Sequence, residues 1–154
     1  MFDRGRRTRF DLRGHAVLHT APNVRKVEPT ASNQAGYEAV CIGTTTSDRM
    51  ERFTRPLMER EGVRLIIGKG GLREDSAKAF WELGGAAALE TTWITAMEDV
   101  DLDDLNPESL WRFAIRDFGP LIVGMDSHGG SHYRAVQESV AAKRAEALAK
   151  LGAA

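Results

Sequence analysis

Two short apolar runs, each ending in a glycine-rich turn, constrain the fold of this chain most strongly. The first run (residues 39–42) leads into GTTTSDRM (43–50), and the second (63–67) leads into GKGG (68–71). The first pattern is typical of a strand, a tight turn and a hydroxyl-rich entry into a helix, whose free backbone N–H groups attract anions. Because both turns follow strands and each carries a cation, they predict a pocket for a carboxylate or a phosphate.

Length and composition indicate an ordinary globular protein. The chain has 154 residues, enough for one domain with a hydrophobic core. Its hydrophobic content of 42%, charged content of 28% and formal net charge of −1 do not favour disorder, nucleic-acid binding or a membrane surface. No apolar run approaches the roughly 20 residues of a membrane helix, and the first residues lack the apolar core of a signal peptide. We therefore expect a cytoplasmic protein.

Hydrophobic periodicity predicts one α/β domain over residues 1–154. We expect strands at 15–20, 37–42, 63–67, 86–89, 93–100, 111–118 and 120–125, and helices at 54–62, 74–83 and 134–151. A loop is expected at 22–36, glycines 84 and 85 should end the second helix, and Asn106 should begin a short helical turn.

Several side chains have expected places within these helices. Thr54 should cap the first helix, with Pro56 tolerated in its first turn. Phe80 and Trp81 of the second helix should lie in the core. The alanine-rich C-terminal helix should turn Val136, Val140 and Leu148 inward.

We expect the charged and histidine side chains outside the two turns to be solvent-exposed and to bind no ligand. Residues 1–10 form a basic arm, which we expect to be solvated rather than a nucleic-acid contact. The acidic group at residues 101–104 lacks the glycine and the distal glutamate of an EF-hand, so a solvated loop is expected. His15 and His19 are four residues apart on a strand, which favours partly exposed side chains over a metal pair.

The spacing around Lys69 excludes the phosphate loop of nucleotide-binding proteins. That motif needs four residues between its first glycine and the Gly-Lys pair, followed by Ser or Thr. Here five residues separate Gly62 from Gly68, and Gly70 follows Lys69. The dinucleotide fingerprint is also absent. The pattern therefore favours a small carboxylate, which an arginine such as Arg49 can hold in a bidentate pair.

Five blocks of the sequence together resemble one family. They are residues 43–50 (GTTTSDRM), 67–71 (IGKGG), 84–89 (GGAAAL), 107–111 (PESLW) and 123–133. In this combination they are similar to the β-type part of the iron–sulfur hydro-lyases, class I fumarase and L-tartrate dehydratase, over roughly residues 11–135. The resemblance implies a swivelling β/β/α three-layer domain and a hydro-lyase that adds water to, or removes it from, a small dicarboxylate.

The resemblance also implies roles for individual residues. Thr45 matches the threonine proposed as the base that removes the carbon-bound proton. Thr46 and Arg49 match substrate-binding positions, and Lys69 matches the lysine that holds a substrate carboxylate. A threonine hydroxyl is a poor base unless positive potential lowers its pKa, and the nearby cations are expected to supply that potential.

The family's [4Fe-4S] cluster cannot be held by this chain. A cluster with one open iron needs three protein thiolates, and Cys41 is the one cysteine of the sequence. No metal ligand is therefore expected here. The resemblance implies that the cluster is ligated by an α-type partner subunit, in a hetero- or homo-oligomer whose active site lies between chains.

Two features depart from the family pattern. An Arg-Asp-x-x-His segment upstream of the first matched strand is not found, and Thr44 stands where the family has a proline. We therefore expect one substrate-binding arginine to be missing, which leaves open a non-catalytic carboxylate-binding or regulatory module, or a degenerate fragment of the hydro-lyase. Fumarate, malate and tartrate also stay open as substrates, because their carboxylates make the same demands on Arg49 and Lys69.

Overall fold

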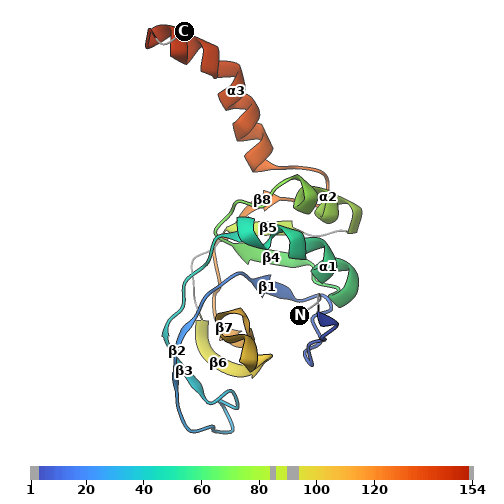
Figure 1. Cartoon of the computed structure of the whole chain (residues 1–154), viewed down its shortest axis with the longest axis vertical. Helices are drawn as coiled ribbons and strands as arrows, with labels where there is room; N and C mark the ends of the chain where they lie inside the picture. Colours follow the sequence, from blue (N-terminus) through green and yellow to red (C-terminus); the bar gives the residue numbers. More distant parts are fainter. Residues whose placement is uncertain (1–3, 84–85, 90–93, 153–154) are drawn as a thin grey trace.

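A computed structural model describes residues 4–83, 86–89 and 94–152 of the chain. Strands and helices are mixed along it, which confirms the predicted α/β class (Figure 1). The helices are α1 (Glu51–Glu61), α2 (Glu74–Leu83) and α3 (His132–Lys150), with 3₁₀ helices η2 (Ser47–Met50) and η3 (Asp103–Glu108). The strands are β1 (Ala16–Leu18), β2 (Asn23–Lys26), β3 (Tyr37–Cys41), β4 (Leu65–Gly68), β5 (Ala86–Leu89), β6 (Ile94–Asp101), β7 (Leu110–Ile115) and β8 (Ile122–Met125).

A four-stranded sheet in the order β1-β4-β5-β8 forms the centre of the molecule. Strands β1, β4 and β5 are parallel, and β8 runs antiparallel to β5. Helices α1 and α2 pack side by side and against the sheet (Figure 1). Ile66 and Ile67 of β4 are both buried, as the uniformly apolar sequence of a central parallel strand predicts.

The hydrophobic core lies between this sheet and the two helices. Met58 of α1 and Phe80 of α2 pack with Ile66 of β4 and Met125 of β8. Phe80 is fully buried, at 0% exposure. Burial of aromatic and aliphatic side chains of this size is the main force that stabilises a domain.

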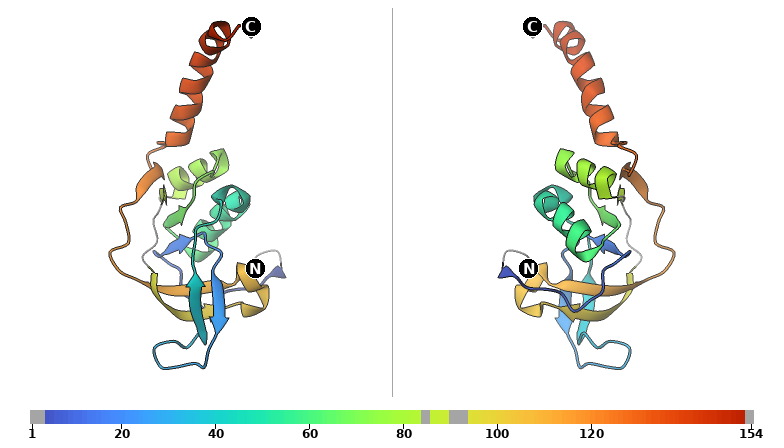
Figure 2. Two further views of the ribbon diagram at one scale, coloured as in Figure 1. Left: turned by 90° about the vertical axis from the view of Figure 1, so that its left-hand side faces the viewer. Right: turned by 90° about the vertical axis from the view of Figure 1, so that its right-hand side faces the viewer.

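Two antiparallel ribbons complete the fold. Strands β2 and β3 pair with each other, as do β6 and β7, and β3 contacts β6. Figure 2 shows both ribbons on the side of the sheet opposite to α3. The more detailed expectation of a swivelling three-layer domain stays a prediction.

The loop predicted over 22–36 is wrong in its first part, where β2 pairs with β3. A loop is expected there because the segment contains two prolines, two asparagines, a serine and a glycine. In the structure Arg25 pairs with Glu38 across the ribbon at 2.8 Å, and both side chains are more than half exposed. A strand in such an exposed ribbon buries no continuous apolar face, so it leaves no hydrophobic alternation in the sequence.

Thr54 does not cap a helix. Helix α1 begins at Glu51, directly after η2, so that Thr54 lies inside it at 1% exposure and Pro56 lies in its interior. The helix ends as predicted at Gly62, whose φ of 70° is left-handed. Similarly, Asn106 does not begin a helical turn but falls within η3, which leads directly into β7.

Two apolar groups predicted to be buried are exposed. Trp81 is 64% exposed, because Phe80 takes the inward position of α2 and the next residue along a helix points about 100° away. Val136 and Val140 are also exposed, since α3 projects from the sheet and buries none of its residues (Figure 2). No helix within the described ranges is long and apolar enough to cross a membrane.

The N-terminal arm is docked rather than solvated. Arg9 pairs with Asp99 at 2.5 Å and Arg6 with Asp104 at 2.6 Å, while the Thr8 hydroxyl donates to Asp101 at 2.7 Å. The acidic residues are therefore partners of the arm and not a solvated loop. The predictions for glycines 84 and 85 and for residue 93 fall outside the described residues.

Candidate functional site at the carboxyl edge of the sheet

The carboxyl ends of β1 and β4 meet at one edge of the central sheet, where open α/β sheets commonly bind ligands. The threonine turn (residues 43–46) crosses this edge. The Thr45 N–H donates to the His19 carbonyl, just after β1, at 2.9 Å. The Ser47 N–H donates to the Gly70 carbonyl, just after β4, at 3.1 Å. The two turns singled out in the sequence therefore form one continuous surface.

These same bonds correct the expected role of the turn's backbone. The N–H groups of Thr45 and Ser47 bond within the protein, so they are not free to hold an anion. Thr46 precedes η2 and makes no side-chain capping bond. Since η2 is a single 3₁₀ turn, a ligand at this edge depends on side chains instead.

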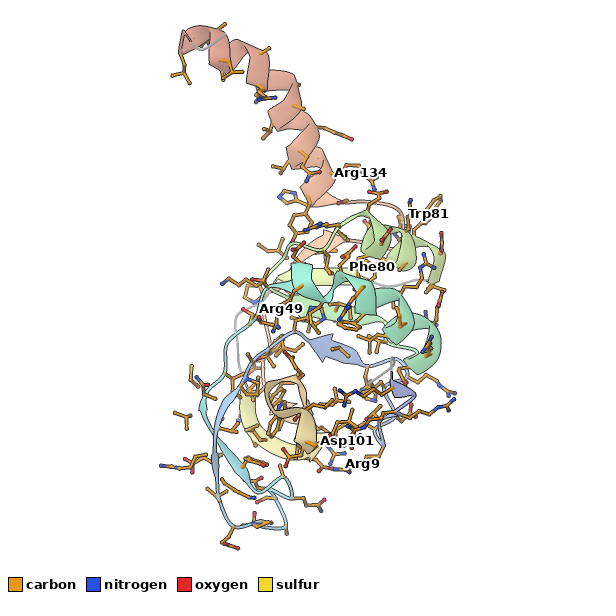
Figure 3. All side chains as sticks on the ribbon, in the orientation of Figure 1. Arg9, Arg49, Phe80, Trp81, Asp101 and Arg134 are labelled. Carbon is orange, nitrogen blue, oxygen red and sulfur yellow. The ribbon has the colours of Figure 1, made fainter. Side chains whose placement is uncertain are left out.

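The Arg49 guanidinium lies between a hydroxyl and a carboxylate. Its Nη2 donates to Thr45 Oγ1 at 3.2 Å, and its Nη1 donates to Glu108 Oε1 at 3.3 Å. The Arg49 side chain is 50% exposed, so a ligand can reach it. Figure 3 shows Arg49 projecting at the edge of the sheet where the threonine turn lies. The structure thus brings Thr45 and Arg49 together, whereas their roles in a reaction stay predictions.

Glycines of the second turn make room for the first turn. A Cβ atom built on Gly68 would overlap the Ser47 hydroxyl, and one built on Gly71 would lie 3.1 Å from Asp48 Cβ. Gly71 also has a φ of 93°, which favours glycine. The GKGG sequence therefore permits close packing between the two turns.

His19 is buried, contrary to the expectation of a partly exposed strand histidine. Its side chain is 4% exposed, whereas His15 on the same stretch is exposed. Neither ring nitrogen has a hydrogen-bond partner in the described part of the chain. Burial lowers the pKa of His19 to about 4, and the positive charge of Arg49 acts in the same direction. The imidazole is therefore neutral at pH 7.

A cavity of about 510 Å³ opens beside these groups. Its wall includes Thr20, His19, Thr45 and Arg49, together with the Glu108 that Arg49 contacts. Three further arginines contribute to the lining: Arg4, Arg6 and Arg52. A volume of this size is in the ordinary range for small-molecule sites, and the arginines outnumber the single carboxylate among the lining residues.

Thr46 and Lys69 occupy the same edge but a different surface. Both are exposed, and neither belongs to the residues that line this cavity. Lys69 directly follows the last residue of β4. The predicted set is therefore divided into a hydrogen-bonded pair, Thr45 with Arg49, and two exposed side chains that do not line the cavity.

Comparison with known proteins agrees with the sequence resemblance. Residues 1–136 match the family described as Fumarase C-terminus. The chain belongs to this family. Because the match spans the arm, the central sheet and both ribbons, the cavity lies wholly within the Fumarase C-terminus region.

Curated relatives carry names from two hydro-lyases. L(+)-tartrate dehydratase subunit beta of Escherichia coli (strain K12) is 41% identical over 131 residues, which cover 79% of this chain and 62% of that protein. A protein of Methanocaldococcus jannaschii, provisionally named L(+)-tartrate dehydratase subunit beta, is 34% identical over 149 residues, covering 90% of this chain and 73% of that protein. A protein of Geobacillus stearothermophilus, provisionally named fumarate hydratase class I, is 33% identical over 138 residues, covering 84% of this chain and 26% of that protein. This chain thus spans about three fifths of the length of the first of these relatives.

The residues of this Fumarase C-terminus chain do not fit an iron–sulfur cluster. Cys41 is its one cysteine and lies exposed on β3. Within the described ranges, no three His, Cys, Asp or Glu side chains lie close enough to hold a metal ion. A cluster therefore cannot be ligated by these residues.

Two members of the site were missed from the sequence. Glu108 sits in a short 3₁₀ helix and meets Arg49 across 59 residues of chain. His19 is buried by a turn that follows it by about 25 residues. No local pattern marks either residue, although the alternation of β1 does place His19 at the strand end.

Proposed function

We propose that this chain is the β-type component of a hydro-lyase that adds water to, or removes it from, a small dicarboxylate. The observation that carries the proposal is the Thr45–Arg49 pair, with Nη2 of the arginine 3.2 Å from the threonine hydroxyl, in an arginine-lined cavity at the carboxyl edge of the sheet. The names of the relatives in the Fumarase C-terminus family support the same reaction class.

Arg49 would hold one substrate carboxylate. Its present partner, Glu108, is half exposed and 3.3 Å away, so this contact is weak. A substrate carboxylate that replaced Glu108 could pair with both Nη atoms, and a bidentate pair fixes orientation as well as position. Charged hydrogen bonds of this kind contribute about 1.5–3 kcal/mol each.

Thr45 would remove the proton from carbon. Deprotonation of a hydroxyl requires that the alkoxide be stabilised, and the Arg49 guanidinium already donates to Thr45 Oγ1. In the dehydration direction the C–H proton passes to the Thr45 alkoxide, a double bond forms between the two central carbons, and the hydroxyl of the neighbouring carbon leaves as hydroxide. The hydroxide takes up a proton from solvent to give water, and Thr45 returns its proton to solvent before the next turnover.

Thr46 and Lys69 would bind the far end of the substrate. Both are exposed at the same edge, and the flexible lysine stem allows the ammonium to swing toward a second carboxylate. This assignment predicts that both residues affect substrate affinity more than turnover.

An α-type subunit would supply the remainder of the active site. The iron–sulfur cluster of such hydro-lyases acts as a Lewis acid, and the single cysteine of this chain means that the partner must hold it. The same proposal includes a single domain over residues 1–154, a cytoplasmic location and a mixed oligomer.

The test is anaerobic co-expression of this chain with an α-type hydro-lyase subunit, followed by assays with fumarate, L-malate and L-tartrate. Co-purification together with turnover of at least one of these acids is expected. Co-purification without turnover, or no complex at all, would favour the alternative of a non-catalytic carboxylate-binding module or a degenerate fragment.

A further inference from the structure

His19 has hydrogen-bonding capacity that the described chain does not use. It is 4% exposed, yet both ring nitrogens lack a partner among the described residues. Leaving a buried polar group unpaired is unfavourable, because the group loses its hydrogen bonds to water. Native proteins accept this cost where a ligand, an ion or a water completes the bonding.

The position of this ring points to a ligand. His19 lies in the wall of the cavity that Thr45 and Arg49 also line, and its carbonyl accepts the Thr45 N–H at 2.9 Å. His19 therefore lines the same cavity as the hydroxyl that the proposed function uses as a base. A ring nitrogen that faces this cavity has no competing partner among the described residues.

The protonation state of His19 limits what it can bind. A neutral imidazole has one N–H donor and one acceptor nitrogen. A carboxylate can use only the donor, because it has no hydrogen to give. A hydroxyl can serve either nitrogen, since it donates and accepts, so a hydroxyl-bearing carbon close to Thr45 suits His19 best.

We propose that His19 is a specificity residue that hydrogen-bonds to a hydroxyl on the carbon from which Thr45 removes the proton. This inference rests on the proposed function and names its substrate class, a 2,3-dihydroxy dicarboxylate. In such an acid the carbon that loses its proton keeps its own hydroxyl, while the hydroxyl of the neighbouring carbon departs as water. In a monohydroxy dicarboxylate that carbon carries only hydrogens, and His19 has no hydroxyl to bind.

The first test compares two substrates in the co-purified complex. His19→Leu should lower kcat/KM for L-tartrate by about 10–100-fold and change kcat/KM for L-malate by less than about threefold. His19→Gln, which keeps a donor and an acceptor, should recover part of the loss. His15→Leu is the matched control, because His15 is exposed and does not line this cavity, and it should change neither value. Equal losses for both acids after His19→Leu, or no loss, would overturn the proposal.

The second test does not depend on turnover. The chain has four histidines, so imidazole ¹⁵N resonances can be assigned in the complex or in the full chain. Added L-tartrate should shift the His19 nitrogens, whereas succinate, which has no hydroxyl, should leave them unchanged. An absent response to tartrate, or an equal response to both acids, would contradict the role of His19. If the wild-type complex turned over none of the tested acids, the proposed function would fail and this spectrum alone would decide.

Discussion

The carboxyl edge of the sheet and the N-terminal arm join distant parts of the chain by different forces. At the edge, the two turns pack so closely that glycine is required at position 68, and the neighbouring Ser47 and His19 are buried. At the arm, segments 90 or more residues apart are held by charged pairs, among them Arg9 with Asp99 and Arg6 with Asp104 (Figure 3 labels Arg9 and Asp101).

This difference has consequences for stability and for function. Close packing positions side chains rigidly, because any displacement creates a cavity or a clash. Exposed ion pairs are screened by water and contribute little each. The edge is therefore suited to hold Thr45 and Arg49 in a fixed geometry, whereas the arm fastens the β6–β7 ribbon with tolerance for change.

The largest effect is expected in the core beneath the edge. Phe80→Ala should lower the free energy of unfolding by about 3–5 kcal/mol, since it empties a fully buried site. Trp81→Ala is the matched control on the same helix, and its 64% exposure predicts a change below about 1 kcal/mol. Urea denaturation of both variants measures the difference, and similar losses would show that α2 does not face the sheet as described.

Protonation of His19 at the edge should destabilise the folded protein at mildly acidic pH, where the ion pairs of the arm are still intact. Burial lowers the pKa of His19 from 6.5 to about 4, so between these values the unfolded chain binds more protons than the folded one. Stability should therefore fall as the pH drops from 6.5 toward 4, by on the order of 2–4 kcal/mol. His19→Gln should remove this part of the pH dependence in denaturation experiments. An unchanged pH profile in the variant would refute the buried neutral state.

The close approach of the two turns can be tested by adding one methyl group. Gly68→Ala places a Cβ against the buried Ser47 and should cost about 1–3 kcal/mol. Gly43→Ala is the control, because nothing lies within 4 Å of its Cβ position. Thermal denaturation should separate the two variants; equal stability would mean that the second turn does not press on the first.

The smallest effect is expected in the arm. Arg9→Ala should lower the free energy of unfolding at pH 7 by less than Phe80→Ala or Gly68→Ala does, because the Arg9 side chain is 55% exposed. The hydrogen bond from Arg9 holds the pKa of Asp99 below its usual value of 3.8, so this contribution is present above that pH and is lost as the pH falls below it. Denaturation of the wild type and the variant at pH 7 and pH 3 measures this. If Arg9→Ala lowered the free energy of unfolding at pH 7 as much as the changes at the packed edge do, the arm would not be held by weak exposed ion pairs.

The same comparison explains how much could be predicted from the sequence. Helix α2 and strand β4 could be predicted from local patterns. The helical spacing of apolar residues indicates a helix with one buried face, and a continuous apolar run indicates a buried strand. The pairing of Arg9 with Asp99 could not be predicted, because a charge carries no sign of a partner 90 residues away.

In the candidate site, too, contacts between residues close in sequence could be predicted, and contacts between distant residues could not. Thr45 and Arg49 are four residues apart, so their contact could be expected from a turn that enters a helix. The burial of His19 depends on how the chain packs around the end of β1. The N–H groups of Thr45 and Ser47 donate to the carbonyls of His19 and Gly70, and these bonds also form only when distant segments pack together. Both are tertiary events that no local spacing reveals.

The most direct test of the site is the kinetics of Thr45→Ala in the co-purified complex, with Thr44→Ala as the neighbouring hydroxyl control. A base that acts only in the transition state predicts that kcat falls by about 10²–10⁴-fold while KM changes by less than a factor of a few, with the control near wild type. A loss shared equally between kcat and KM, or a Thr45→Ala enzyme with wild-type turnover, would contradict a proton-removing role for this edge of the sheet.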